Sequence, residues 1–239
     1  MSSLGVGAAT ILTARETIFH FFRSLPVCLF ITIGLFGAFQ GNENYIFFVI
    51  GLGLLAPAVA VSLNMLLEFI FTKIDGWTGN ETHSYWLVPN GASCTLFEQL
   101  SKNPLDSMCA VPTVWTVMTA FFFTYIFVNA YDIYNRRVPQ KADQTAVNAR
   151  KTRCVMSMIF IVALFIIAII GRYSIMHCET MFGMIIGLLV GGGLGYGWYD
   201  FSRSCGVGQF DDIFGISSRL LSRAASGGTA PKICVPVAN

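Results

Sequence analysis

The sequence predicts an all-α fold, a polytopic membrane helix bundle with about five transmembrane helices, on three observations. Hydrophobic residues make up 54% of the 239 residues and charged residues 12%, and the mean hydropathy of +0.63 lies outside the usual range of soluble domains. Several apolar runs approach the roughly 20 residues that a helix needs to cross about 30 Å of hydrocarbon. The basic residues gather in particular loops and the formal net charge is only +2, which argues against a nucleic-acid partner.

The expected bundle occupies residues 1–199, and its apolar runs follow one another along the chain. Arg23 and Pro26 interrupt the first run near its start, where a long side chain can snorkel to the interface. The second run carries Asn64 and Glu68 toward its far end, and the fourth has hardly a polar atom. The expected spans are 17–39, 45–71, 110–131, 154–170 and 181–199, with a polar outer loop at 72–108.

The connection between the third and fourth spans sets the orientation. It is the densest basic segment of the chain, with Arg136, Arg137, Lys141, Arg150, Lys151 and Arg153. The positive-inside rule places it in the cytoplasm, so the N-terminus, the outer loop and the 171–180 turn are expected outside and the tail, 200–239, inside. Apart from Arg23 within its span, ten Lys and Arg residues then lie inside and four outside.

The first span also fits a cleaved secretory signal. Arg15 and Arg23 precede an apolar run that ends at Phe39, with small residues near Ala38. Cleavage would leave four spans and turn the basic connection to the wrong side, so the charge distribution favours an uncleaved helix.

The outer loop carries two candidate modifications. Asn80 begins an Asn-Glu-Thr glycosylation sequon. Cys94 and Cys109 are candidates for a disulfide, which would contribute about 3 kcal/mol in the chain-entropy model, and Cys178 faces the same compartment. On the inner side, the apolar residues of 210–221 recur at near-helical spacing, which fits either a short amphipathic helix on the membrane surface or a tail packed against the bundle.

The fifth span has a glycine at every fourth position. Gly183, Gly187, Gly191 and Gly195 leave one face without side chains, so a neighbouring backbone can approach closely. A helix of the same chain is the favoured neighbour, with oligomerisation through this face as the alternative. A conducting pore is disfavoured because the spans lack the polar rings that selectivity requires.

Arg172, His177, Glu179 and Thr180 lie just before that glycine-rich helix. Singly, Arg172 is an interfacial anchor and His177 a helix-end residue. A polar outer loop, a span that opens with Pro, an all-apolar span, and then Arg and His before a glycine-rich helix is an order that resembles the type 2 phosphatidic acid phosphatase family of membrane lipid phosphatases. The resemblance implies a helical fold with an active site at the outer face, here with Lys73, Arg172 and His177 as the catalytic candidates.

The chain departs from the motifs of that family at most positions. Lys73 has no Arg-Pro after it, and Pro112-Thr113-Val114-Trp115 stands where the family has Pro-Ser-Gly-His, so Trp115 replaces the histidine that protonates the leaving group. His177 follows Arg172 after four residues instead of five, and no Asp follows at the family's distance. Losing the acid and part of the cationic clamp would each reduce turnover about a hundredfold or more. The site is therefore interpreted as decayed or as never catalytic.

The remaining patterns predict no cofactor and no metal. His20, His83 and His177 have no partner at a zinc-ligand spacing, and no Lys follows Gly191-Gly192-Gly193 as a phosphate-binding loop requires. Arg23 and Glu68 both belong to the outer halves of their spans, where snorkelling explains them structurally.

The leading hypothesis is a non-catalytic, five-span structural membrane protein in contact with the lipid bilayer and with other membrane or capsid-type proteins. The tail around 210–216 is similar in style to multi-pass proteins in the internal membranes of large DNA viruses, which implies a virion membrane component that bridges lipid and a protein shell. The alternatives are a divergent lipid or isoprenoid phosphate phosphatase and a small transporter that uses the polar positions of the second helix.

Overall fold

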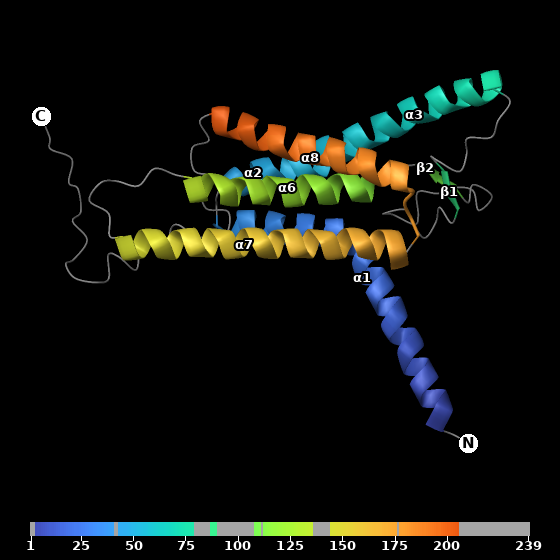
Figure 1. Ribbon diagram of the computed structural model, residues 1–239, viewed down its shortest axis with the longest axis horizontal. Coiled ribbons are helices and arrows are strands. Elements are labelled where there is room, and N and C mark those ends of the chain that lie inside the picture. Colours follow the sequence, from blue (N-terminus) through green and yellow to red (C-terminus); the bar gives the residue numbers. More distant parts are fainter. Residues whose placement is uncertain are drawn as a thin grey trace, which may run out of the picture.

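The computed structural model describes residues 3–40, 43–78, 87–89, 108–110, 112–135, 144–175 and 177–205 (Figure 1). These residues are almost entirely helical, with two short antiparallel strands, β1 (Leu87–Pro89) and β2 (Met108–Ala110). The helices are α1 (Ser3–Gln40), α2 (Glu43–Ile50), α3 (Ala56–Thr78), α6 (Val114–Asn135), α7 (Gln144–Ile170) and α8 (Met181–Ser204). Two π-helical segments, η1 (Gly51–Leu55) and η3 (Gly171–Ile175), continue α2 into α3 and extend α7.

Five helical stretches are long and apolar enough to cross a membrane. They are His20–Phe39, Asn44–Phe71, Val114–Asn135, Val147–Ser174 and Met181–Ser204. The predicted all-α bundle with about five membrane-length helices is thereby confirmed, and the chain has the character of a multi-pass membrane protein. Large apolar side chains cover the outer face of α7, among them Ile159, Phe160 and Ile167, as expected for a helix in contact with hydrocarbon.

The second membrane-length stretch is continuous from α2 through η1 to α3. Gly51 opens the π-helical segment, and a Cβ atom there would collide with the indole of Trp198 on α8. The indole Nε1–H of Trp198 donates to the carbonyl of Phe47, with 3.1 Å between nitrogen and oxygen. The missing side chain of Gly51 thus lets α8 approach this stretch. Farther along, α3 runs on to Thr78 and includes residues 72–78, which the apolar pattern leaves in the outer loop.

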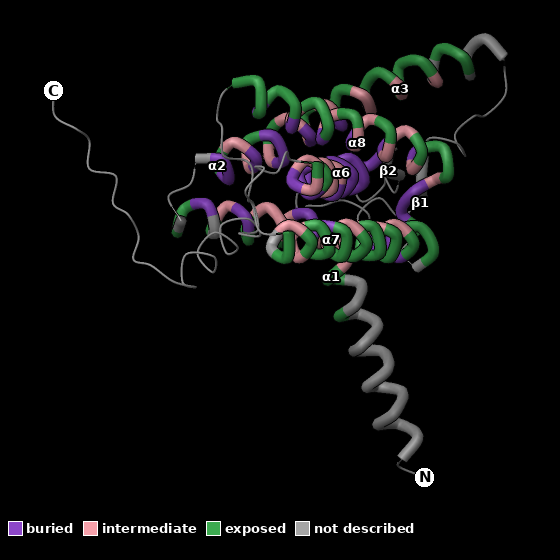
Figure 2. The backbone as a smooth tube through the Cα atoms, turned by 60° about the vertical axis from the view of Figure 1, so that its left-hand side comes forward, coloured by how far each residue is buried: buried purple, intermediate pink, exposed green. Residues whose placement is uncertain are grey.

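Helix α6 is the centre of the bundle (Figure 2). In the apolar part of this helix 72% of the residues are buried, against 18% to 28% in the corresponding parts of the other four membrane-length stretches. Phe121 and Tyr125 of α6 are fully buried, and the ring of Phe48 on α2 lies 4.5 Å from that of Tyr125 between centroids. A helix that is apolar all round is expected at such a position. The other helices are arranged around α6.

The glycine face of α8 packs against α6. A Cβ atom on Gly191 would collide with the carbonyl oxygen of Val117, and one on Gly195 would collide with that of Phe121. A Cβ atom on Gly187 would lie 2.8 Å from the Cγ2 atom of Thr116. The two backbones meet within the chain, in the way that small residues at four-residue spacing allow in membrane helices.

Two predicted features of the inner side lie outside the described residues. They are the amphipathic segment 210–221 and the basic residues Arg136, Arg137 and Lys141. The described part of the chain after α6 resumes at Gln144, the first residue of α7.

Gly191→Ala is expected to destabilise the protein by about 1–3 kcal/mol, because the added methyl group forces α6 and α8 apart. The matched control is Gly193→Ala, since a Cβ atom at Gly193 meets nothing within 4 Å and alanine is the better helix former. The measurement is equilibrium unfolding in mixed detergent micelles. Equal stabilities for the two variants would contradict the packing of α8 on α6.

Candidate functional site

Glu179 is a buried carboxylate bound by the first turn of α6. Its side chain is 6% exposed. One carboxylate oxygen accepts the backbone N–H of Thr113 at 3.0 Å, and the other accepts the hydroxyls of Thr113 at 2.8 Å and of Thr116 at 3.0 Å. Thr113 and Thr116 are three residues apart, so both hydroxyls lie on the same side of the helix start. The carboxylate therefore has three donors from one helical turn.

The residue after Glu179 begins the next helix. The hydroxyl of Thr180 accepts the backbone N–H of Gly183 at 3.0 Å, so Thr180 is the N-cap of α8. At the start of α6, the carbonyl of Thr113 accepts the N–H groups of Thr116 at 3.1 Å and Val117 at 3.3 Å. Glu179 and Thr180 thus fix the starts of α6 and α8 beside each other.

Arg172 is buried against Trp115, which lies between Thr113 and Thr116 at the start of α6. It belongs to η3, is 2% exposed, and its guanidinium carbon lies 5.1 Å from the centroid of the Trp115 ring. A guanidinium is weakly hydrated and stacks on indole faces, so this cation–π contact tolerates burial better than a lysine would. The positive charge of Arg172 also acts on Glu179.

Trp115 binds the carbonyl that a proline leaves without a donor. Pro26 lies inside α1 and has no N–H group, so the carbonyl four residues earlier, that of Phe22, loses its helical hydrogen bond. The indole Nε1–H of Trp115 donates to this carbonyl, with 2.7 Å between nitrogen and oxygen. Since an unsatisfied carbonyl in an apolar environment is costly, the Trp115 bond explains how α1 accommodates Pro26.

Burial raises the pKa of Glu179 above its ordinary value of 4.5. The loss of hydration outweighs the opposing effects, which come from the hydrogen bonds of Thr113 and Thr116 and from the charge of Arg172. The carboxyl group accordingly holds its proton more tightly in the folded protein than in the unfolded chain.

His177 and Cys178 form the turn between η3 and α8. His177 is exposed and has a φ of 51°, in the left-handed region that is uncommon for residues other than glycine. Cys178 is buried and disulfide-bonded, whereas Cys28, Cys154 and Cys205 are not in disulfides. The sequence placed Cys178 in the same compartment as the outer-loop cysteines but did not single it out as a disulfide candidate.

The three residues predicted under the phosphatase resemblance lie in different surroundings. Lys73 is exposed on α3, with its ammonium nitrogen 5.7 Å from the centroid of the Phe69 ring. Arg172 is buried against the ring of Trp115, whereas His177 is exposed. A phosphate clamp needs cationic donors that converge on an accessible space. Arg172 is instead buried, and its guanidinium makes a cation–π contact with Trp115 of α6.

The remaining predicted residues are only partly within the described part of the chain. Asn80 and Cys94 lie outside it, and of Cys109 only the backbone in β2 is described, so glycosylation and the Cys94–Cys109 disulfide stay predictions. Within the described ranges, no group of three or more His, Cys, Asp or Glu residues is placed to hold a metal ion.

Sequence reasoning missed the pairing of Glu179 with Thr113 and Thr116. Both partners lie in segments that the sequence had already singled out. Pro112-Thr113-Val114-Trp115 and the segment from Arg172 to Thr180 occupy the positions of two phosphatase motifs. The contacts of Trp115 with Arg172 and of Thr113 with Glu179 bring those two segments together.

No protein-family model, curated protein or solved structure matches the chain. The resemblances to the lipid phosphatases and to viral membrane proteins stay predictions.

Trp115→Phe is expected to destabilise the protein by about 1–3 kcal/mol, because it leaves the carbonyl of Phe22 without a donor. In a Pro26→Ala background the loss is expected to be smaller, since an alanine at this position supplies the N–H group that Pro26 lacks. A double-mutant cycle by unfolding in micelles measures the difference. Equal losses in the two backgrounds would show that Trp115 does not compensate for the proline.

The thermal stability of the protein is expected to depend on the ionisation of Glu179. The pKa of this acid is raised in the folded state, so its contribution favours folding most below pH 4.5 and is lost as pH rises through the raised pKa. The melting temperature of the wild type should therefore fall with rising pH more steeply than that of Glu179→Gln. Identical pH profiles for the wild type and Glu179→Gln would contradict this prediction.

Proposed function

We propose that the protein is a structural, non-catalytic component of a membrane, whose outer loop and basic inner face contact other membrane or capsid-type proteins. The proposal rests on one observation: the polar side chains around the start of α6 are bonded within the protein. Glu179, Thr113, Thr116 and Trp115 bind one another or a neighbouring helix, with Arg172 stacked on Trp115. Such contacts stabilise a bundle, whereas a catalytic site needs the same groups directed at a substrate.

The alternatives receive less support from the surroundings of their residues. A phosphatase would need Arg172 and His177 to converge on a phosphate with an acid nearby, yet Arg172 is buried against Trp115 and His177 is exposed. A transporter would need the polar positions of the second stretch to line a path, and Glu68 is exposed on α3. Both arrangements fit structural roles.

The basic end of α7 supports the proposed orientation and contact surface. Lys151 and Arg153 are exposed, and Arg150 lies beside them at the start of the same helix. Under the positive-inside rule this end faces the cytoplasm, with the tail on the same side. If the membrane is that of a virion, the same cationic face would meet the protein shell.

Purified protein reconstituted with phosphatidic acid or a polyprenyl diphosphate is expected to release no phosphate above protein-free liposomes. A known lipid phosphatase in the same liposomes is the positive control. Cross-linking in the source membrane is expected to recover a defined protein partner in stoichiometric amount. Phosphate release that His177→Ala abolishes would overturn the proposal in favour of the phosphatase, and solute uptake lost on Glu68→Gln would favour a transporter.

A further inference from the structure

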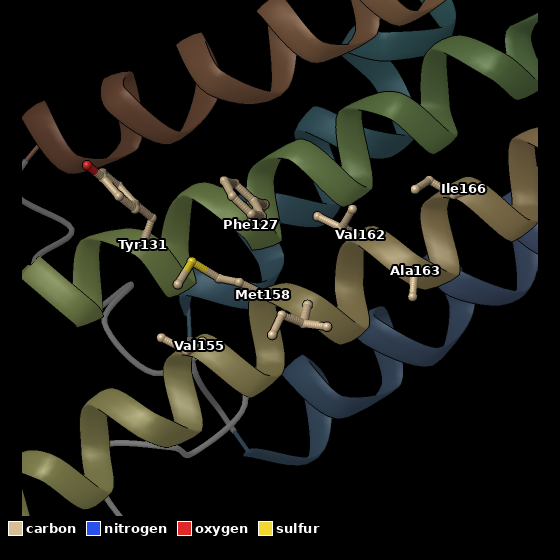
Figure 3. Close-up of a pocket in the computed structure, with 8 residues that line it drawn as sticks. Phe127, Tyr131, Val155, Met158, Val162, Ala163 and Ile166 are labelled. Carbon is tan, nitrogen blue, oxygen red and sulfur yellow. The ribbon is translucent and has the colours of Figure 1, made fainter.

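An apolar groove of about 590 Å³ runs between α6 and α7 on the outside of the bundle (Figure 3). The side chains that line it include Phe127 and Tyr131 of α6 and Val155, Val162, Ala163 and Ile166 of α7. With Met158 and Ile159, which also line the groove, the α7 residues fall at positions 155, 158, 159, 162, 163 and 166. Residues three and four positions apart are neighbours on a helix surface, so these six form one face of α7. Ala163 contributes only a methyl group between its larger neighbours, and the groove is open to the surroundings of the helices.

The length of the groove matches one leaflet of a bilayer. Val155 and Ile166 are eleven positions apart on α7, or about 16 Å at 1.5 Å per residue. This is about half of the 30 Å thickness of the hydrocarbon core. One acyl chain extends through a single leaflet, so the groove has the length that such a chain needs.

One end of the groove is cationic. Lys151 precedes Val155 by four residues and therefore lies on the same face of α7, one turn nearer the basic connection. It is exposed, and its ammonium nitrogen lies 5.8 Å from the centroid of the Tyr134 ring on α6. The nearby carboxylate of Asp132 is bound by Arg203 at 2.8 Å. Among the described residues Asp132 is paired with Arg203, and the side chain of Lys151 is exposed at this end of the groove.

We propose that this groove binds an anionic phospholipid, with one acyl chain between α6 and α7 and the phosphate beside Lys151. Basic residues at the end of a cleft between membrane helices attract anionic headgroups, and a lysine stem extends along apolar surface to place its charge at headgroup level. The apolar side chains of the groove favour a lipid acyl chain, and the charge of Lys151 favours an anionic headgroup over a zwitterionic one. The site depends on the chain lying in a membrane and is independent of the proposed structural role.

Native mass spectrometry of the full-length protein, equilibrated with equal amounts of phosphatidylglycerol and phosphatidylcholine of the same acyl chains, tests the proposal. The wild type is expected to retain more phosphatidylglycerol than phosphatidylcholine. Lys151→Gln is expected to lower the ratio of the two about fivefold, which corresponds to the effect of one lysine near a membrane surface. Ala163→Phe, which fills the groove, is expected to reduce the retention of both lipids.

The matched control is Lys73→Gln. Lys73 is also an exposed lysine above an aromatic ring, with 5.7 Å to the centroid of Phe69, but it lies on α3 and outside the groove. This variant should keep the wild-type lipid ratio. Equal retention of the two lipids by the wild type, or a ratio that Lys151→Gln leaves unchanged, would overturn the proposal. A dimer that Ala163→Phe dissociates would also overturn it, since the groove would then belong to a second copy of the chain.

Discussion

The first turn of α6 joins this helix to α1, to η3 at the end of α7 and to the residue that precedes the N-cap of α8. Thr113 and Thr116 bind the carboxylate of Glu179, which precedes α8. Trp115 donates to the carbonyl of Phe22 in α1 and makes a cation–π contact with Arg172 of η3. In hydrocarbon the hydrophobic effect does not drive helices together, so close packing and hydrogen bonds between helices must do so. The hydroxyls of Thr113 and Thr116 and the indole N–H of Trp115 therefore contribute much of the hydrogen bonding between these segments.

Close packing continues this contact along the membrane-spanning length. The glycines of α8 let its backbone lie on the carbonyls of Val117 and Phe121, and the aromatic residues around Tyr125 fill the space beyond them. Because α6 is enclosed by its neighbours, the surface left for lipid belongs largely to α1, α3, α7 and the outer side of α8. The groove between α6 and α7 is on that lipid-facing surface, and Ala163 is the smallest of the side chains that line it.

The membrane-length helices could be predicted from the sequence because apolar runs of such length have only one stable form in hydrocarbon. The glycine repeat predicted a close contact but not that the neighbour is α6, since the repeat says nothing about the partner. The bonds of Glu179 join residues 63 and 66 positions apart, and Trp115 and Phe22 are separated by 93. No local pattern encodes such pairs. The π-helical segment at Gly51, where the indole of Trp198 approaches, depends on the tertiary structure in the same way.

The account of this protein as a bundle held at the first turn of α6 is tested most directly by a double-mutant cycle between Thr116 and Glu179. Thr116→Val and Glu179→Leu each remove one partner of the 3.0 Å hydrogen bond between the two side chains. The free energies of unfolding in micelles are predicted to be non-additive, with a coupling of about 0.5–3 kcal/mol, as for residues in direct contact. Additive losses would show that the two side chains do not interact and would contradict the account.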